Sequence, residues 1–508
     1  MVIGSGFGGS VVACRLAESG ARVLMLERGR PWPPQSFART PSEWRQALWA
    51  PRDGRHGLFE LHHFRGLDSV VSSGLGGGSL IYANVLLRKD PATFAPDGLP
   101  LDAAELAPHY DRIERVIAPQ PYPWADRTPK TRALLDAAAR AGLDAELPPL
   151  AIAFGDRPGQ PLPAAGDVHG GVPRETCRLC GACDVGCRYG AKQTLDFTFL
   201  TAAQTAGAEI RCCCEARVLE QAGSGWRVHY RQHLAARDDQ RPELLDPVAE
   251  PERTVEADRV IVAAGTFGST ALLLRNRAGL ARLSPRLGHG FSGNGDLLMF
   301  LRRADRMLDP ATGPVITASV RVDEAQSPSG RGFLIQDAGA PAFSEWLWQA
   351  LEAPGDLWRA VRRRSPAEAF GTARASAAMM PLLGMGRDVP GGRMELDGDR
   401  LTLTWRSTAS RAYYEGLEDA ARRLGDALSA TVHRPLGRRT RLISVHPLGG
   451  CPMGTSPETG VVDDRGRVFG HDGLLVADGS ILPGPVGVNP SLTIAALADR
   501  IADGLVRS

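Results

Sequence analysis

Four cysteines lie close together near the middle of the chain, at spacings that allow metal or redox chemistry. Cys177, Cys180, Cys183 and Cys187 form a C-x₂-C-x₂-C-x₃-C run, which brings three or four thiolates onto one turn of backbone. The spacing matches the ligand run of ferredoxin-type iron–sulfur clusters, although arginine rather than proline follows the last cysteine. Structural zinc more often uses two separated pairs of ligands. The run therefore favours an iron–sulfur cluster and leaves a zinc site or unligated thiols open.

The first residues of the chain contain a glycine turn that is typical of dinucleotide binding. Gly4, Gly6 and Gly9 occupy the three positions of G-x-G-x-x-G, between an apolar strand and a helix predicted over Gly9–Ser19. The first glycine allows the tight turn, the second lets the backbone approach a pyrophosphate, and the third lets the helix pack on the sheet. The free N–H groups at the start of this helix favour a negatively charged ligand.

An acidic residue and a second glycine turn narrow the kind of nucleotide. Glu27 ends the next predicted strand, about 20 residues past the turn, where a carboxylate accepts hydrogen bonds from a ribose. Arg28 beside it leaves a 2′-phosphate open. Another glycine-rich turn, Gly76–Ser79, implies a second close approach of backbone to ligand. Two such turns suit a long ligand such as FAD, whereas the first turn alone does not distinguish FAD from NAD.

Length and composition limit the classes of protein that fit. A chain of 508 residues predicts two domains or one large discontinuous pair. The 59 basic and 57 acidic residues give a net charge of +2 without a block of like charge, so we expect no nucleic-acid partner. No run of about 20 apolar residues occurs, so we expect no membrane span. Because the sequence starts in the first strand, we expect a cytoplasmic protein without a signal peptide, and further residues before Val2.

The order of predicted elements indicates a nucleotide domain assembled from distant pieces. A buried strand within residues 254–265 precedes a helix over Thr266–Arg275, which repeats the strand–glycine–helix pattern of the N-terminus. We expect FAD-binding segments at 1–90, 200–296 and 441–508, a loop-rich cap with the cysteine run at 91–199, and a substrate domain at 297–440. Further helices are predicted over Asp102–Ile117, Pro129–Gly142 and Ser491–Val506. Strands over Pro314–Val322 and Leu401–Trp405, and an aromatic group of Phe343, Trp346, Trp348 and Trp358, are predicted in the substrate domain.

The C-terminal segment carries polar residues beside glycines and a helix start. His446 lies in a glycine-rich bend, and Asp478 follows a short apolar strand. Asn489-Pro490 places an amide side chain and a proline immediately before the last helix, where free N–H groups can face an oxyanion or a flavin edge.

These signals occur in one order along nearly the whole chain, and in that order they resemble the glucose–methanol–choline (GMC) flavoprotein oxidoreductases. The matching segments are the first glycine turn with Glu27, Gly76–Ser79, Ala263–Gly265, His446-Pro447, Asp478-Gly479 and Asn489-Pro490. Within the family the chain looks like the bacterial cholesterol oxidase branch, in its leaderless subgroup with the cysteine run. The resemblance implies FAD and an α/β fold, with a discontinuous Rossmann-like FAD-binding domain and a mixed β-sheet/helix substrate domain.

The resemblance also implies roles for individual residues. His446 would be the base or proton relay near flavin N5, and Asn489 would orient the substrate oxygen or the flavin. Glu27 would take the adenosine ribose, and Val218 would hold adenine through its backbone. The other residues implied to contact the cofactor are Gly4, Gly6, Gly9, Gly77, Gly78, Ser79, Asn84, Ala264, Gly265, Asp478, Gly479 and Pro490. The active-site glutamate of the sterol-oxidising branch has no clear counterpart. Glu345 is our candidate for it, which leaves sterol specificity and steroid isomerisation open.

We therefore expect an FAD-dependent oxidoreductase that oxidises a CH–OH group by hydride transfer to the flavin. The aromatic content of the predicted substrate domain favours a bulky hydrophobic alcohol such as a sterol. Electrons would pass to O₂ or to a redox protein or quinone. Two alternatives are a flavin/iron–sulfur electron-transfer module without its own alcohol chemistry, and an NAD-dependent dehydrogenase that uses the first glycine turn alone.

Overall fold

A five-stranded parallel sheet is built from three segments that are distant in sequence. The computed structural model of the protein describes residues 1–164, 166–235, 246–247, 252–339, 341, 378–434 and 442–507. The strand order is β24-β14-β1-β2-β8. The strands are β1 (Val2–Ile3), β2 (Leu24–Leu26), β8 (Glu209–Arg211), β14 (Val260–Val262) and β24 (Leu474–Val476). The apolar residues of β1, β14 and β24 are buried, as expected for parallel strands covered on both faces.

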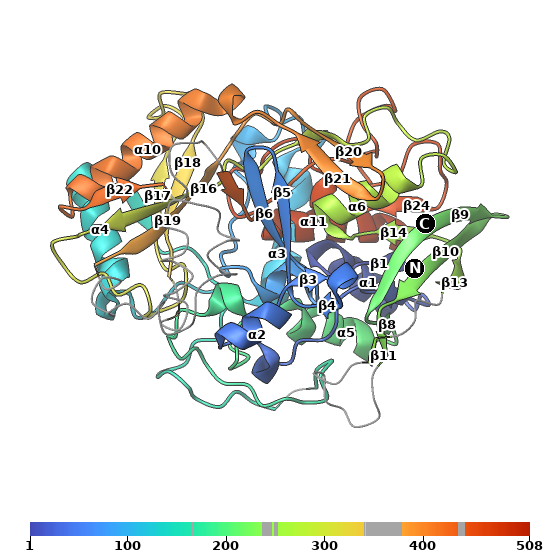
Figure 1. Ribbon diagram of the computed structural model, residues 1–508, viewed down its shortest axis with the longest axis horizontal. Helices are drawn as coiled ribbons and strands as arrows, with labels where there is room; N and C mark the ends of the chain where they lie inside the picture. Colours follow the sequence, from blue (N-terminus) through green and yellow to red (C-terminus); the bar gives the residue numbers. More distant parts are fainter. Residues whose placement is uncertain are drawn as a thin grey trace.

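Helices from both ends of the chain pack together against this sheet. They are α1 (Phe7–Glu18), α3 (Ala103–Ile117), α5 (Phe199–Thr205), α6 (Gly265–Arg275) and α11 (Ser491–Val506). Helix α1 contacts both α5 and α11, and α3 packs on α11. Figure 1 shows both chain termini at this end of the molecule. The predicted helices over residues 102–117, 266–275 and 491–506 are confirmed within a residue, and α1 begins two residues earlier than predicted.

A six-stranded antiparallel sheet lies at the opposite end of the molecule (Figure 1), with strand order β22-β16-β19-β18-β17-β7. Its strands are β7 (Asp144–Glu146), β16 (Leu297–Arg302), β17 (Ser319–Val322), β18 (Phe333–Asp337), β19 (Met380–Gly386) and β22 (Thr431–His433). Helices α4 (Pro129–Ala141) and α10 (Arg411–Asp426) pack on it through a second apolar core. The parallel sheet and the antiparallel sheet together form the predicted α/β fold.

The remaining described helix and strands lie outside the two large sheets. They are α2 (Pro41–Gln46), β3 (Trp49–Ala50), β4 (Arg55–His56), β5 (Phe59–Phe64), β6 (Leu67–Ser72), β9 (Cys214–Ala222), β10 (Gly225–Gln232), β11 (Leu234–Ala235), β12 (Asp246–Pro247), β13 (Glu252–Ala257), β15 (His289–Phe291), β20 (Gly392–Asp397), β21 (Arg400–Thr404) and β23 (Leu442–Ser444). The aromatic group at residues 343–358 and Glu345 lie outside the described residues. No helix in the described part of the chain combines the length and the apolar character that a bilayer crossing needs.

One glycine of the first turn is required for packing rather than for a ligand. A Cβ atom at Gly8 would lie 1.6 Å from the carbonyl oxygen of Ala477, just past the end of β24. At Gly6, two residues earlier, a Cβ atom would meet nothing within 4 Å, and φ is −69°. The start of α1 therefore packs tightly on the C-terminal segment at Gly8, whereas Gly6 faces open space.

We expect Gly8→Ala to destabilise the FAD-free protein by at least about 2 kcal/mol, because the added methyl forces helix and strand apart. Thermal unfolding of the apoprotein measures this effect. Gly6→Ala is the matched control and should unfold at the wild-type temperature. Equal melting temperatures for Gly8→Ala and wild type would contradict the packing described here.

Candidate functional site

The two glycine turns face each other and leave an open cradle between them. A Cβ atom at Gly77 would lie 2.7 Å from the Cα atom of Gly6, so the turns are in contact. A Cβ atom at Gly6, Gly78 or Gly265 would have no neighbour within 4 Å. A Cβ atom at Gly4 would lie 2.3 Å from the Ala263 carbonyl oxygen, so the segment that leads into Gly265 also packs on the first turn. A ligand that needs close approach to backbone atoms fits here, as a pyrophosphate does.

Glu27 is buried beside the first turn and keeps acceptor capacity for a ribose. One carboxylate oxygen accepts hydrogen bonds from the Ser5 N–H (2.9 Å) and hydroxyl (2.6 Å). Among the described residues the other oxygen accepts only from the Gly29 N–H at 2.8 Å, and a carboxylate oxygen takes about two such bonds. Burial raises the pKa of Glu27, partly offset by these donors. Arg28 is paired with Glu60, so its charge is neutralised within the protein rather than offered to a 2′-phosphate.

Asn84 gives the clearest sign of a site for a polar ligand. Its side chain is fully buried, and neither its amide nitrogen nor its amide oxygen has a hydrogen-bond partner in the described structure. An unpaired buried polar group costs about 1–3 kcal/mol, so such a residue is expected to meet a polar ligand. Val218, on β9, is 39% exposed and offers apolar surface of the kind that an aromatic base covers. Together with the cradle, these residues fit FAD.

Two other predicted cofactor residues are already engaged within the protein. The Ser79 hydroxyl donates to the Gly76 carbonyl at 2.7 Å and accepts from the Leu195 N–H at 3.1 Å. The buried Asp478 carboxylate accepts from the Gly265 N–H and from the Ser480 N–H, both at 2.8 Å. Burial raises the pKa of Asp478. These side chains shape the cradle, and direct contact of either with a cofactor stays a prediction.

His446 lies at the edge of this cradle and is held by a buried carboxylate. Its Nδ1 atom is 2.9 Å from Oδ1 of Asp296, whose side chain is completely buried. The other oxygen of Asp296 accepts from the backbone N–H groups of Val445 (2.9 Å) and His446 (3.1 Å) and from the Ser444 hydroxyl. The described residues provide no hydrogen-bond partner for Nε2 of His446, whose side chain is 17% exposed. The imidazole therefore presents Nε2 outward as an acceptor.

The bend that carries His446 is fastened to the cofactor cradle. The Thr266 hydroxyl, one residue after Gly265, donates to the Pro447 carbonyl at 2.6 Å. The Gly449 N–H donates to the carbonyl of Gly479 at 3.0 Å. These bonds join the histidine bend to two of the segments predicted to bind the cofactor, as the sequence analysis requires.

A single turn, residues 292–296, positions both predicted catalytic residues. Asp296 holds His446, while the Asn294 side chain accepts from the N–H groups of Val486 (2.9 Å) and Gly487 (3.0 Å) and donates to the Val488 carbonyl (2.9 Å). Those three residues lead directly into Asn489. Asp388 holds the start of the turn by accepting hydrogen bonds from the Ser292 hydroxyl and the Gly293 N–H. Burial raises the pKa of Asp388 to about 6.

Asn489 is buried and paired with a residue that the sequence analysis missed. Its amide exchanges hydrogen bonds with the amide of Gln336 on β18, at 3.0 and 3.3 Å. Pro490 is the N-cap of α11, as predicted. The sequence analysis also missed Asp296 and Asn294. The motif Ser292-Gly293-Asn294-Gly295-Asp296 was the available signal, because it is a glycine-rich turn with two polar residues directly before an apolar strand.

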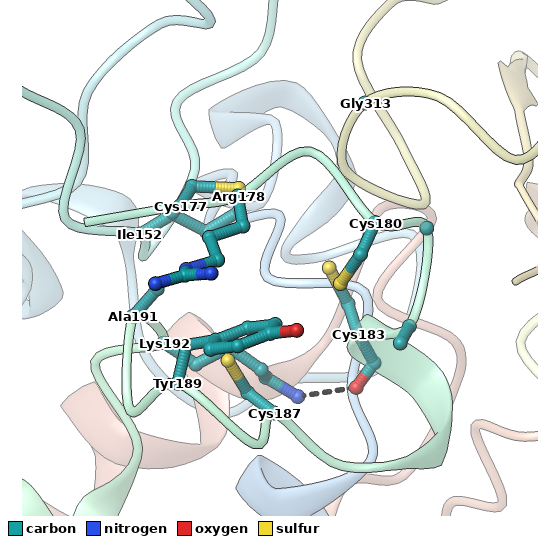
Figure 2. Close-up of a pocket in the computed structure, with 12 residues that line it drawn as sticks. Ile152, Cys177, Arg178, Cys180, Cys183, Cys187, Tyr189, Ala191, Lys192 and Gly313 are labelled. Atoms are coloured by element: carbon teal, nitrogen blue, oxygen red, sulfur yellow. Dashed lines mark hydrogen bonds between the residues drawn. The ribbon is translucent and has the colours of Figure 1, made fainter. Parts of the chain in front are cut away.

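The four cysteines line one small pocket without forming a metal site. The pocket holds about 20 Å³, and Figure 2 places Cys177 and Cys183 on opposite sides of it. Among the described residues no group of three or more His, Cys, Asp or Glu side chains could hold a metal ion. Burial raises the pKa of Cys177 and Cys180, and that of Cys183 to about 11, which favours protonated thiols. The predicted cluster or zinc ligation is therefore not confirmed.

The physical reason is the path of the loop. Leu179 and Gly181 have positive φ and Gly186 turns again at φ 92°, so sequence spacing does not translate into convergent thiols. Lys192 occupies the pocket wall instead. Its buried ammonium donates to the carbonyl of Cys183 at 2.7 Å (Figure 2). It also donates to the carbonyls of Tyr82 (2.8 Å) and Leu80 (3.1 Å), which ties the cysteine loop to the residues at the end of the second glycine turn.

Comparisons with known proteins agree on one family. Residues 168–293 and 354–498 match the GMC oxidoreductase family, and residues 2–31 match an NAD(P)-binding Rossmann-like domain. A cholesterol oxidase of Mycobacterium tuberculosis is 31% identical over 99% of this chain and 90% of its own length. A cholesterol oxidase of Acinetobacter baumannii is 30% identical over 98% and 93%. The structure of pyridoxine 4-oxidase from Mesorbium loti covers 100% of this chain and 99% of its own, with a TM-score of 0.65 and 18% identity, which supports the fold.

We expect Gly6→Ala to fold normally and to lose FAD. The added methyl occupies space that is open in the protein but lies where the backbone must approach a pyrophosphate. The affinity for FAD, measured by titrating the apoprotein, should fall at least about tenfold. Gly391→Ala, at an exposed glycine with equally open surroundings and no positive φ, is a control that should leave affinity unchanged. Wild-type affinity in Gly6→Ala would place the pyrophosphate elsewhere.

Proposed function

Because the chain belongs to the GMC oxidoreductase family, whose members are FAD-dependent enzymes that oxidise alcohols, we propose that it oxidises the CH–OH group of a bulky hydrophobic alcohol such as a sterol, with His446 as the catalytic base. The observation that carries this proposal is the pairing of His446 Nδ1 with the buried Asp296 carboxylate. FAD, when bound in the cradle, supplies the hydride acceptor.

The geometry suits His446 to proton transfer. A carboxylate accepts only, so Nδ1 carries the proton that it shares with Asp296, and in the neutral imidazole Nε2 then has a free lone pair. A substrate hydroxyl next to Nε2 can pass its proton to this nitrogen. The resulting imidazolium is stabilised by the charge of Asp296, and this arrangement follows the general rule that a buried acid fixes the tautomer of a histidine base. Asn489 would orient the substrate oxygen or the flavin.

Two observations support a hydrophobic substrate. Val445, beside the catalytic histidine, is 45% exposed and is one of few large apolar side chains on the described surface. The relatives from Mycobacterium tuberculosis and Acinetobacter baumannii, 31% and 30% identical to this chain, are named cholesterol oxidases. A relative from Streptomyces fradiae, 28% identical over 99% of the chain, is named paromamine 6′-oxidase, so a polar amino-sugar alcohol is the alternative to test against.

For the electron acceptor we propose O₂ or a redox protein or quinone. Air reoxidation of the reduced enzyme distinguishes an oxidase from a dehydrogenase. An iron–sulfur or zinc centre has no part in this proposal, because the thiols of the described structure do not converge on a point. The alternative of an electron-transfer module without alcohol chemistry predicts that no alcohol bleaches the flavin.

We expect anaerobic addition of a sterol to bleach the flavin of the wild-type protein. His446→Ala should keep its FAD but reduce it about 10²–10⁴-fold more slowly, which is the usual contribution of a positioned acid–base group. Rapid-mixing absorbance measures the reduction rate, and the flavin-to-protein absorbance ratio checks cofactor content. His433→Ala, at an exposed histidine on the edge strand β22, is the control.

A His446→Ala protein that reduces its flavin at the wild-type rate would exclude this histidine as the base. Bleaching by paromamine-like amino sugars, with none by sterols, would overturn the hydrophobic substrate and leave the family chemistry intact.

A further inference from the structure

Gln336 makes a two-way contact with one active-site residue. Its Nε2 donates to Oδ1 of Asn489 at 3.0 Å, and Nδ2 of Asn489 donates back to its Oε1 at 3.3 Å. Gln336 is fully buried and Asn489 is 6% exposed. The two residues are 153 positions apart in sequence, so the contact exists only in the folded protein.

The pairing leaves Asn489 with a defined set of free groups. A primary amide has two N–H donors and an oxygen that accepts about two hydrogen bonds. One donor and one acceptor site of Asn489 are used by Gln336, so one N–H and one lone pair are presented elsewhere. If the nitrogen and oxygen of both side-chain amides were interchanged, each amide would still donate one hydrogen bond and accept one. The number of free groups on Asn489 is therefore the same in either orientation.

Each partner is fixed independently of the other. The residue after Gln336 is the buried Asp337, which accepts from the N–H groups of Thr317 (2.7 Å) and Ala318 (2.8 Å) and pairs with Lys130. The segment before Asn489 is held by Asn294 and by the ammonium of Lys89, which donates to the carbonyls of residues 485 (3.0 Å) and 486 (3.3 Å). The amide pair is therefore preorganised rather than formed on ligand binding.

We propose that Gln336 is a positioning residue of the active site: it fixes the Asn489 amide in the orientation that serves substrate oxidation. This inference rests on the proposed function, because it requires Asn489 to act on the substrate or the flavin. Gln336 works through Asn489 alone and is assigned no contact with the reacting atoms.

The test is a double-mutant cycle of Gln336→Met and Asn489→Ala on the FAD-loaded enzyme. Anaerobic rapid-mixing experiments measure the flavin reduction rate and the substrate Kd of each variant. Methionine fills the same space without polar hydrogen-bonding groups of comparable strength. Gln336→Met removes both hydrogen bonds to Asn489, and because it frees the Asn489 amide to turn, it should slow reduction about tenfold with little change in Kd. The double variant should be no slower than Asn489→Ala.

Two further measurements separate positioning from general damage. In the FAD-free protein, the melting-temperature losses of the two variants should be less than additive in the double variant, because both break the same contact. Gln336→Glu keeps the acceptor for Nδ2 of Asn489 and should recover part of the rate. Leu334→Met, on the same face of β18, is the control and should keep the wild-type rate.

Three results would overturn the inference. If the rate losses of the single variants multiply in the double variant, Gln336 acts independently of Asn489. A wild-type rate in Gln336→Met, with Asn489→Ala slow, removes the positioning role and leaves the proposed function intact. A wild-type rate in Asn489→Ala removes the role of Asn489 itself, and with it this inference and that part of the proposed function.

Discussion

A buried carboxylate needs hydrogen-bond donors around it. The observed donors to the Asp296 carboxylate all belong to three consecutive residues, 444–446. The Ser444 hydroxyl, the N–H groups of residues 445 and 446 and the His446 ring converge on its two oxygens. Because leaving such a charge unpaired costs several kcal/mol, the chain at 444–446 has little freedom to move away. The position of His446 is therefore a consequence of satisfying one buried carboxylate.

The turn that carries Asp296 satisfies further buried polar groups. Asn294 satisfies three backbone groups of residues 486–488, and Gly386 donates its N–H to the Asn294 carbonyl. The turn also lies directly before β16, so the antiparallel sheet and the segment leading to α11 meet there. One five-residue turn thus joins the antiparallel sheet to the segments that carry His446 and Asn489. Glycine surfaces at residues 6, 78 and 265 provide the space on the cofactor side.

Local patterns allowed much of the fold to be predicted. The glycine turn, the helix starts and the buried strands depend on neighbouring residues, so the sequence contains their signals. His446 and Asn489 were also identifiable, through a family resemblance. Their partners Asp296 and Gln336 were missed because each contact spans about 150 residues, and neither residue type is distinctive on its own. Tertiary contacts of this kind leave no periodic pattern in the sequence from which they could be predicted.

The cysteine run is the opposite case, because a local signal was present and the structure does not confirm the metal site that it favoured. Its spacing is a local signal for metal binding, but left-handed residues such as Leu179 and Gly181 bend the loop so that the thiols line a pocket without converging. Spacing fixes which residues are near one another and does not fix where their side chains point. The Glu345 assignment and the aromatic group lie outside the described residues and stay predictions.

The most direct test of the account is the anaerobic flavin reduction rate of Asp296→Asn. An amide at this position can donate to Nδ1 and so favour the tautomer that carries its proton on Nε2, which removes the base without removing a side chain. The account predicts a protein with full FAD content whose flavin is reduced about 10²–10⁴-fold more slowly than in wild type. Reduction at the wild-type rate would show that the buried carboxylate does not control the histidine, and would contradict the central claim.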